Sequence, residues 1–214
     1  MDLLRNFLSL SKNLGIVSAF DLFDLDSPLN LRVLSPREIE VYSKFTSIKR
    51  KHEFIAGRIA CKKAFFKLIL DKTDCLKKFS SVSVLNTETG SPFIDNSDFC
   101  VSISHSHGIA IASACKHAVG VDIEQINPKK IDTLKRMSSE YPSENYRDLT
   151  VLWTLKEALG KALRTGIIKE FSHYRTENFH CEGKIYHCKF KNFPFSGVAI
   201  TNDTYAIAIA SISE

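Results

Sequence analysis

The chain has 214 residues, of which 44% are hydrophobic and 25% are charged, a composition that is typical of a folded globular protein and excludes a disordered chain. It has no run of 18 apolar residues and no signal-peptide pattern, so we expect neither a membrane span nor a membrane partner. The net charge of +5 indicates an anionic partner, and six cysteines without C-x-x-C spacing indicate reduced thiols in a cytoplasmic protein.

The hydrophobic pattern predicts helices and strands in mixed order. A short amphipathic helix or a frayed tail is expected at 1–14 and a strand at 16–25. Ser35-Pro36-Arg37-Glu38 is a capping-box sequence and predicts a helix that runs to about residue 45. We further expect a long helix at 50–70, a strand at 81–85, two strands within 101–114, a strand around 119–124, a helix at 146–164, and strand pairs within 179–191 and 197–211.

The segment Val119-Gly120-Val121-Asp122-Ile123-Glu124 is the first candidate for chemistry. Side chains two apart on a strand lie on the same face, so Asp122 and Glu124 are expected side by side. Such a pair is either part of a solvated outer face or part of a site for a hard divalent cation, which proteins hold with carboxylates together with phosphate oxygens and waters.

The predicted helix at 146–164 carries Glu157 and Lys161, which are four residues apart and therefore share one face. The pair is either an ordinary surface ion pair or, together with Asp122 and Glu124, a site for Mg²⁺ and a phosphate. Three carboxylates packed together would repel one another without a cation.

The sequence also contains an internal repeat at an offset of 98 residues. Ile109–Ser113 is identical to Ile207–Ser211, Lys63 aligns with Lys161, and Asp24-Leu25-Asp26 aligns with Asp122-Ile123-Glu124. Self-similarity at a fixed offset indicates repeated structure. We therefore expect an α+β protein with two similar lobes, each a small antiparallel sheet packed on a long helix and related by a pseudo-two-fold, with boundaries at 1–115 and 116–214.

Two further segments carry groups that bind phosphate. Arg58 and Lys62 share a helix face with Arg50 preceding them, and they form either a solvated basic face or a phosphate site, because arginine forms forked contacts to phosphate oxygens. Ser104 and His105 lie near a predicted turn and offer hydrogen-bond donors of the kind that suit phosphate.

In combination these motifs resemble the 4'-phosphopantetheinyl transferases. The resemblance is carried by G-R-x-x-x-x-K from Gly57, S-x-S-H-S from Ser102, G-V-D-I-E from Gly120 and W-T-x-K-E-A-x-x-K from Trp153. Within the family the chain looks like the pseudodimeric type that activates surfactin synthetase. The last two motifs are the most specific, and the repeat extends the match over nearly the whole chain.

The resemblance implies transfer of 4'-phosphopantetheine from coenzyme A to a serine of an apo acyl or peptidyl carrier protein, leaving 3',5'-ADP. It implies Mg²⁺ at Asp122, Glu124 and Glu157, with Glu157 also as the base and Lys161 on the reacting phosphate. The implied coenzyme A contacts come from Arg58, Ser104, His105, Lys156 and Lys161.

The sequence departs from the family at Gly90-Ser91-Pro92, where the family often has G-K-P. Arg50 or Lys62 is expected to replace the missing lysine. The resemblance also implies that an acidic carrier helix docks on a basic cluster of four residues, Lys129, Lys130, Lys135 and Arg136. We expect a monomer, because both lobes lie in one chain, and no nucleic acid partner.

Two other functions remain open from the residues alone. The same carboxylates would serve a Mg²⁺-dependent nucleotide phosphohydrolase, and a non-catalytic module that binds coenzyme A or a carrier protein would retain part of the motifs. Incubation with coenzyme A, Mg²⁺ and an apo carrier separates the three functions.

Overall fold

The computed structural model describes residues 1–70, 76–139, 141–168 and 170–212. By its internal contacts the chain divides into two units. We call Leu10–Lys116 the N-terminal unit, and we call His117–Glu214 together with Met1–Ser9 the C-terminal unit. The first nine residues thus group with the C-terminal unit, whereas the sequence analysis assigns them to the first lobe.

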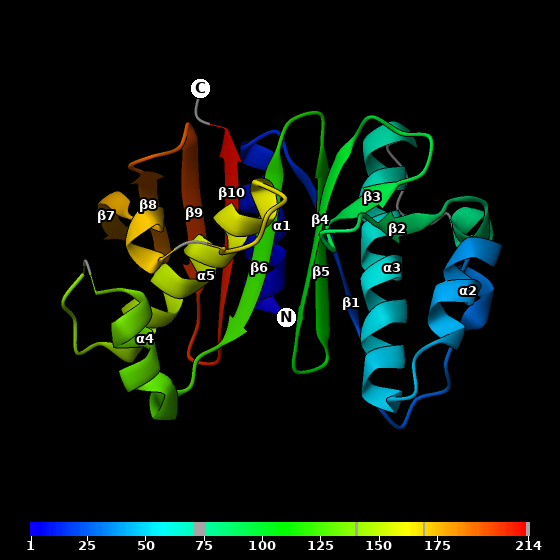
Figure 1. The fold of residues 1–214 in the computed structure, drawn as a ribbon, viewed down its shortest axis with the longest axis horizontal. Helices are drawn as coiled ribbons and strands as arrows, with labels where there is room; N and C mark the ends of the chain where they lie inside the picture. Colours follow the sequence, from blue (N-terminus) through cyan, green and yellow to red (C-terminus); the bar gives the residue numbers. More distant parts are fainter. Residues whose placement is uncertain (71–75, 140, 169, 213–214) are drawn as a thin grey trace. The chain divides into compact units, whose positions relative to one another are not determined.

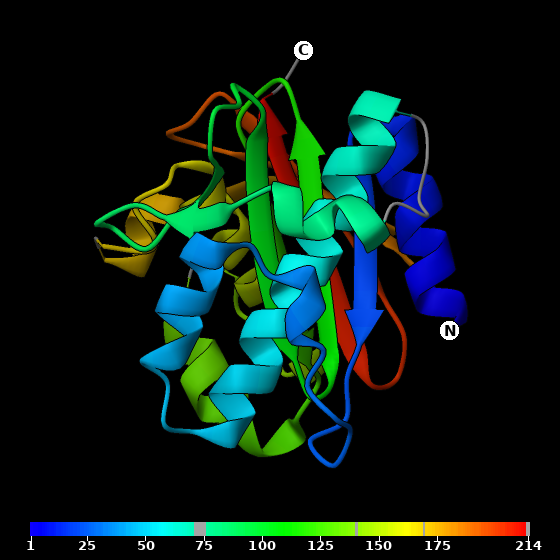
Figure 2. The ribbon, with the colours of Figure 1, turned by 90° about the vertical axis from the view of Figure 1, so that its right-hand side faces the viewer.

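The N-terminal unit consists of a long helix packed on an antiparallel sheet. The sheet has the order β1-β5-β4, formed by Val17–Leu22, Ile109–Cys115 and Cys100–Ser106. Helix α3 (Ile48–Leu70) runs along this sheet and is drawn in cyan in Figure 2. The unit also holds the helix α2 (Pro36–Ser43), a hairpin of β2 (Val84–Asn86) and β3 (Pro92–Ile94), and two 3-10 turns at Leu31–Val33 and Leu76–Ser81.

The capping box predicted at Ser35 is confirmed. The Ser35 hydroxyl accepts from the Glu38 backbone N–H at 3.3 Å, and Glu38 Oε2 accepts from the Ser35 N–H at 2.7 Å. The other Glu38 oxygen, Oε1, accepts from the Val84 N–H at 2.9 Å, so one carboxylate joins the start of α2 to β2. The buried charge is satisfied by hydrogen bonds, as a buried carboxylate requires.

The C-terminal unit repeats this plan with a larger sheet. Its five strands have the order β6-β10-β9-β8-β7 and lie side by side in Figure 1. They are formed by Val119–Gln125, Tyr205–Ile212, Phe195–Thr201, Ile185–Phe190 and Thr176–Glu182. Helix α5 (Tyr146–Ala162) packs on β6, β10 and β9, and the shorter α4 (Ile131–Met137) packs on α5. 3-10 turns lie at Pro128–Lys130 and Phe171–Tyr174.

Small side chains allow α5 to lie close to the sheet. Ala206, Ala208 and Ala210 of β10 are fully buried in the core beneath α5, and they pair with Glu124, Asp122 and Gly120 of β6. Paired residues of neighbouring strands share a face. The two carboxylates of β6 therefore lie on the same face as the helix. At Gly120 the approach is so close that an added Cβ would lie 1.8 Å from the Ala158 carbonyl oxygen.

The repeat is present in the structure, but one part of the predicted alignment is wrong. Asp21 pairs with Ala110 in the first sheet and Asp122 pairs with Ala208 in the second, and these alanines are 98 residues apart. Asp21 is therefore the counterpart of Asp122, and the offset on this strand is 101 rather than 98. Strand β1 ends at Leu22, before Asp24 and Asp26. The N-terminal unit has three more residues than the C-terminal unit between this strand and the strand that pairs with it, so the offset of 98 does not apply to Asp21 and Asp122.

The α+β class is confirmed, with an antiparallel sheet packed on a long helix in each unit. Residues 1–14 form the amphipathic helix α1 (Asp2–Asn13) rather than a frayed tail. The pseudo-two-fold relation between the units stays a prediction. Within the described residues, no helix has the length and apolar character needed to cross a membrane.

Candidate active site

Two carboxylates of β6 lie beneath α5 and not on a solvated outer face. The Asp122 side chain is only 6% exposed, and Glu124 is half-buried. This burial excludes the first of the two alternatives that the strand pattern left open. A buried carboxylate needs a compensating partner, and α5 supplies one for each.

Helix α5 presents Trp153, Glu157 and Lys161 at intervals of four residues, so the three side chains share one face. Lys161 Nζ lies 2.6 Å from Asp122 Oδ1 and forms an ion pair with it. At the other end, the indole N–H of Trp153 donates to Glu124 Oε1 at 3.3 Å. Lys161 therefore forms an ion pair with Asp122 on β6, and its role is not limited to a surface pair with Glu157.

The carboxylates influence one another electrostatically. Burial first, and then the charges of Asp122 and Glu124, raise the pKa of Glu157 to about 7 against the opposing effect of Lys161. Burial and the charge of Asp122 also raise the pKa of Glu124, while Lys130, the Trp153 hydrogen bond and Lys161 lower it. These mutual effects mean that the three carboxylates lie close enough to interact.

The raised pKa of Glu157 predicts how stability depends on pH in the metal-free protein. Between the ordinary value of 4.5 and the folded value of about 7, Glu157 is protonated in the folded state and ionised in the unfolded state. The native state then binds more protons than the unfolded state. The contribution of Glu157 to stability is therefore full below pH 4.5 and is lost as the pH rises through 7. Replacement Glu157→Gln should remove this loss.

The measurement is the melting temperature of the wild type and of Glu157→Gln at pH 5 and pH 8, with a chelator present. The melting temperature of the variant should rise relative to that of the wild type at pH 8 but not at pH 5. An equal difference at both pH values would contradict a raised pKa at Glu157. Added Mg²⁺ should reduce the gain, because a bound cation favours the ionised carboxylate.

The donor set fits a hard divalent cation, although it does not form a closed cage. Carboxylate oxygens are the ligands that suit Mg²⁺. Among the described residues, no group of three or more His, Cys, Asp or Glu side chains is arranged closely enough to hold a metal ion by itself. Mg²⁺ ordinarily takes one or two carboxylates and completes its shell with substrate phosphates and waters, so an open arrangement of this kind is what a phosphate substrate requires.

A separate cavity of about 170 Å³ in the N-terminal unit brings together three of the predicted phosphate-binding residues, Arg50, Arg58 and His105. The turn at Gly90 and Pro92 lines the same cavity. Arg50 Nη1 lies 3.4 Å from His105 Nε2. The cavity therefore combines cations with the loop in which this chain departs from the family motif.

Arg58 is held rigidly at this cavity. Its Nε donates to the Val84 carbonyl at 3.2 Å, its Nη2 donates to Asn86 Oδ1 at 2.6 Å, and its guanidinium lies 4.0 Å from the centre of the Phe54 ring. Asn86 in turn donates to the Gly90 carbonyl at 2.5 Å, so Arg58 and the Gly90 turn are linked. Burial lowers the pKa of Arg58 to about 10, which leaves it charged at neutral pH.

Two lysines predicted to contact coenzyme A are buried and bonded within the chain, so the structure gives no support to these contacts, which stay predictions. Lys62 has no exposed surface, and its Nζ binds Glu38 at 2.5 Å and the Val33 carbonyl at 2.8 Å. Lys156 also has no exposed surface, and it donates to the Met137 carbonyl at 2.7 Å. Both lysines connect elements of the fold.

Ser104 is 6% exposed and lies on the opposite face of β4 from His105, because successive strand residues alternate. The structure does not bring it to the cavity of Arg50 and Arg58, and its contact with coenzyme A stays a prediction. Glu53, which was not predicted from the sequence, also lines that cavity and lies 3.7 Å from both Arg50 and His105. Its spacing of three residues from Arg50 on a helix was the available signal.

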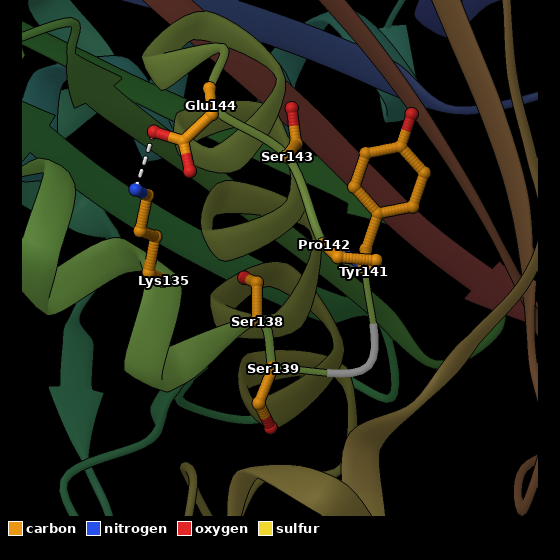
Figure 3. Close-up of a pocket in the computed structure, with 7 residues that line it drawn as sticks. All are labelled: Lys135, Ser138, Ser139, Tyr141, Pro142, Ser143 and Glu144. Carbon is orange, nitrogen blue, oxygen red and sulfur yellow. Dashed lines mark hydrogen bonds and ion pairs between the residues drawn. The ribbon is translucent and has the colours of Figure 1, made fainter.

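The basic cluster predicted to dock a carrier lies on the segment between the two carboxylate motifs. Lys129 and Lys130 are in a 3-10 turn, and Lys135 and Arg136 are on α4. Figure 3 shows Lys135 directed toward Glu144, and the two side chains form an ion pair at 2.5 Å beside a surface pocket. The charge of Lys135 is thus partly neutralised within the chain, while docking at this cluster stays a prediction.

Comparison with known proteins agrees with this division of the chain. The family model described as the 4'-phosphopantetheinyl transferase N-terminal domain matches residues 40–115, and that of the 4'-phosphopantetheinyl transferase superfamily matches residues 118–210. The holo-(acyl-carrier-protein) synthase of Petrotoga mobilis is 33% identical over 99 residues, which are 39% of this chain and 77% of that protein. The synthase of Enterococcus faecalis is 40% identical over 88 residues, which are 38% of this chain and 71% of that protein.

Solved structures of such synthases are also similar to parts of the chain. One is the holo-(acyl-carrier-protein) synthase from Bacillus anthracis in complex with coenzyme A (3',5'-ADP), at 26% identity and a TM-score of 0.37, covering 46% of this chain and 92% of that one. The Thermotoga maritima synthase has 23% identity and a TM-score of 0.37, and the match covers 58% of this chain and 90% of that one. From the sequence matches, the chain belongs to the 4'-phosphopantetheinyl transferase superfamily.

Proposed function

We propose that this chain transfers the 4'-phosphopantetheine group of coenzyme A to a serine hydroxyl of an apo carrier protein and releases 3',5'-ADP. The observation that carries the proposal is the pairing of α5 with β6, in which Lys161 lies 2.6 Å from Asp122 while Glu124 and Glu157 interact with Asp122 electrostatically. Phosphoryl transfer depends on positioning and on neutralising charge more than on covalent chemistry.

The residues have distinct proposed roles. Asp122, Glu124 and Glu157 would hold Mg²⁺, which when bound would polarise the pyrophosphate and offset its negative charge. Lys161, already located at Asp122, binds the phosphate that is attacked. Glu157 accepts the proton of the incoming serine hydroxyl, directly or through water.

The reaction then balances as one displacement at phosphorus. The serine oxygen forms a bond to the phosphorus that bears the pantetheine group, and the bond from that phosphorus to the bridging oxygen of 3',5'-ADP breaks. The serine proton passes to Glu157, and the leaving phosphate takes the negative charge. Lys161 stabilises the charge that develops during this exchange.

We propose further that the chain is of the pseudodimeric type and works as a monomer with one site. Two family models match successive parts of one chain, and both units share one plan. At the positions that correspond to Glu124 and Glu157, the N-terminal unit has Phe23 and Ile59. Only the C-terminal unit therefore carries the carboxylate set, and sedimentation of active protein as a trimer would contradict this assignment.

The cavity at Arg58 supports a role for the N-terminal unit in binding the 3'-phosphate of coenzyme A. Replacement Arg58→Ala should raise the KM for coenzyme A about 10- to 100-fold, in keeping with the loss of a charge-assisted hydrogen bond. Dephospho-coenzyme A, which lacks only that phosphate, is the control substrate, and its KM should change much less. Equal changes for both substrates would assign Arg58 a purely structural role through Val84 and Asn86.

The test of the proposed function is incubation with coenzyme A, Mg²⁺ and a panel of apo acyl and peptidyl carrier proteins. Transfer adds the mass of one phosphopantetheine to the carrier and releases 3',5'-ADP. Hydrolysis of coenzyme A without a mass gain on any carrier would favour a phosphohydrolase, and neither product would favour a binding module. The panel also identifies the pathway that the carrier serves.

A further inference from the structure

The chain has a single tryptophan, and its indole N–H donates a hydrogen bond to one of the candidate metal ligands. The N–H is only a donor, and it donates to Glu124 Oε1 at 3.3 Å. A hydrogen bond between the one indole and a carboxylate of the site is a specific arrangement. It raises the question of what the indole does for that carboxylate.

The geometry of α5 against β6 indicates an answer. Trp153 and Lys161 are eight residues apart, about 12 Å along a helix, whereas Asp122 and Glu124 are about 7 Å apart along a strand. Their long side chains converge on the two carboxylates from both ends, and Glu157 lies midway between them on the same helix face. Each strand carboxylate thus has one oxygen engaged by α5, Asp122 Oδ1 by Lys161 and Glu124 Oε1 by Trp153.

The indole is itself fixed in orientation. Its ring meets Phe171 of the 3-10 turn edge-to-face, with centroids 5.7 Å apart and planes at 76°. The ring and Glu124 also line one cavity of about 250 Å³. A donor held in this way restricts the rotation of the Glu124 carboxylate, as groups hydrogen-bonded to metal ligands commonly do.

We propose that Trp153 is a positioning residue of the active site: its indole N–H engages Oε1 of Glu124 and directs the other oxygen toward the divalent cation. This inference rests on the proposed function, since it assumes that Glu124 is a metal ligand. It assigns to Trp153 a role in metal affinity that is separate from packing. The effect of Trp153 on metal affinity should therefore depend on the indole N–H and not on the size of the ring.

Because Trp153 is the one tryptophan of the chain, biosynthetic replacement alters this residue alone. Benzothienylalanine exchanges the N–H for sulfur and keeps the ring shape, whereas 4-fluorotryptophan keeps the N–H and serves as the matched control. The probe is Mn²⁺, titrated into the protein with coenzyme A and followed by the electron paramagnetic resonance of the free ion. Benzothienylalanine should weaken Mn²⁺ binding about tenfold, and 4-fluorotryptophan should not.

The rate of transfer should recover at high metal concentration, because the loss is in metal binding and not in the chemical step. Unchanged Mn²⁺ affinity with benzothienylalanine, or equal weakening by both analogues, would overturn the role of the N–H. Replacement Asp122→Asn, measured in the same titration, separates the two hypotheses. Retained Mn²⁺ affinity in Asp122→Asn would overturn the metal site itself, whatever the analogues do.

Discussion

Replacement Asp122→Asn should lower kcat/KM for transfer about 10³-fold, the upper part of the range for losing one preorganised electrostatic contact. The amide keeps the size of the side chain but loses the charge that would hold Mg²⁺. It also leaves Lys161, now 2.6 Å from Asp122 Oδ1, without its anionic partner. The measurement is steady-state kinetics with coenzyme A and an apo carrier at several Mg²⁺ concentrations.

The matched control is Asp21→Asn in the N-terminal unit. Asp21 Oδ1 lies 2.6 Å from Lys63 Nζ, and this pair corresponds to Asp122 and Lys161 in the repeat. Its side chains are 19% and 30% exposed, so the pair should contribute about 1 kcal/mol or less to stability. Activity should stay within about twofold of wild type, since both sites share the pairing geometry but only one has the further carboxylates. Equal loss in both variants would mean that the ion pair acts through the fold.

The structure agrees with the predicted placement of side chains where that placement depends on short sequence distances. Alternation on a strand placed Asp122 beside Glu124, and helical spacing placed Glu157 and Lys161 on one face. The capping box at Ser35 likewise depends on a local hydrogen-bond pattern. Each of these inferences needs only the geometry of a single element. The ion-pair partner of Lys161, in contrast, comes from β6, and spacing on the helix alone does not reveal it.

The sequence pattern did not indicate which lysines are buried, because the partners of these lysines lie far away in the sequence. Lys62 and Lys63 are adjacent on α3, yet Lys62 is buried on Glu38 while Lys63 meets Asp21. Which of the two is buried depends on how α2 and β1 pack on α3, and the sequence pattern of one helix does not contain that information. Lys156 and Lys161 differ for the same reason, since the Met137 carbonyl that binds Lys156 belongs to α4.

The N-terminal cavity shows a further limit of motif reading. The motif residue Arg58 was found, but Glu53 was not, although it lies between Arg50 and His105 with a side chain 14% exposed. A carboxylate among cations reduces the positive potential that a phosphate would meet. The cations of the cavity are therefore partly neutralised by the chain's own carboxylate, and residue types in a motif overstate the charge that they present.

Replacement Gly120→Ala should have the largest effect on the fold. A Cβ there would lie 1.8 Å from the Ala158 carbonyl oxygen and 2.6 Å from the Ala162 nitrogen. Both are backbone atoms, so no side chain can rotate away and α5 itself must move off β6. Overpacking in a core costs about 1–3 kcal/mol and occasionally more, and we expect a loss of about 3 kcal/mol or more in the free energy of unfolding.

The same displacement should disable the site in whatever fraction folds, because it carries Lys161 and Trp153 away from the β6 carboxylates. Gly57→Ala on α3 is the stability control: the nearest atom to its Cβ is the Ile103 Cγ2 at 3.1 Å, a side-chain methyl that can adjust, and alanine improves helix propensity by up to about 1 kcal/mol. Chemical denaturation measures both variants. A Gly120→Ala protein with wild-type stability and turnover would show that α5 does not need this close contact to bring its side chains to Asp122 and Glu124.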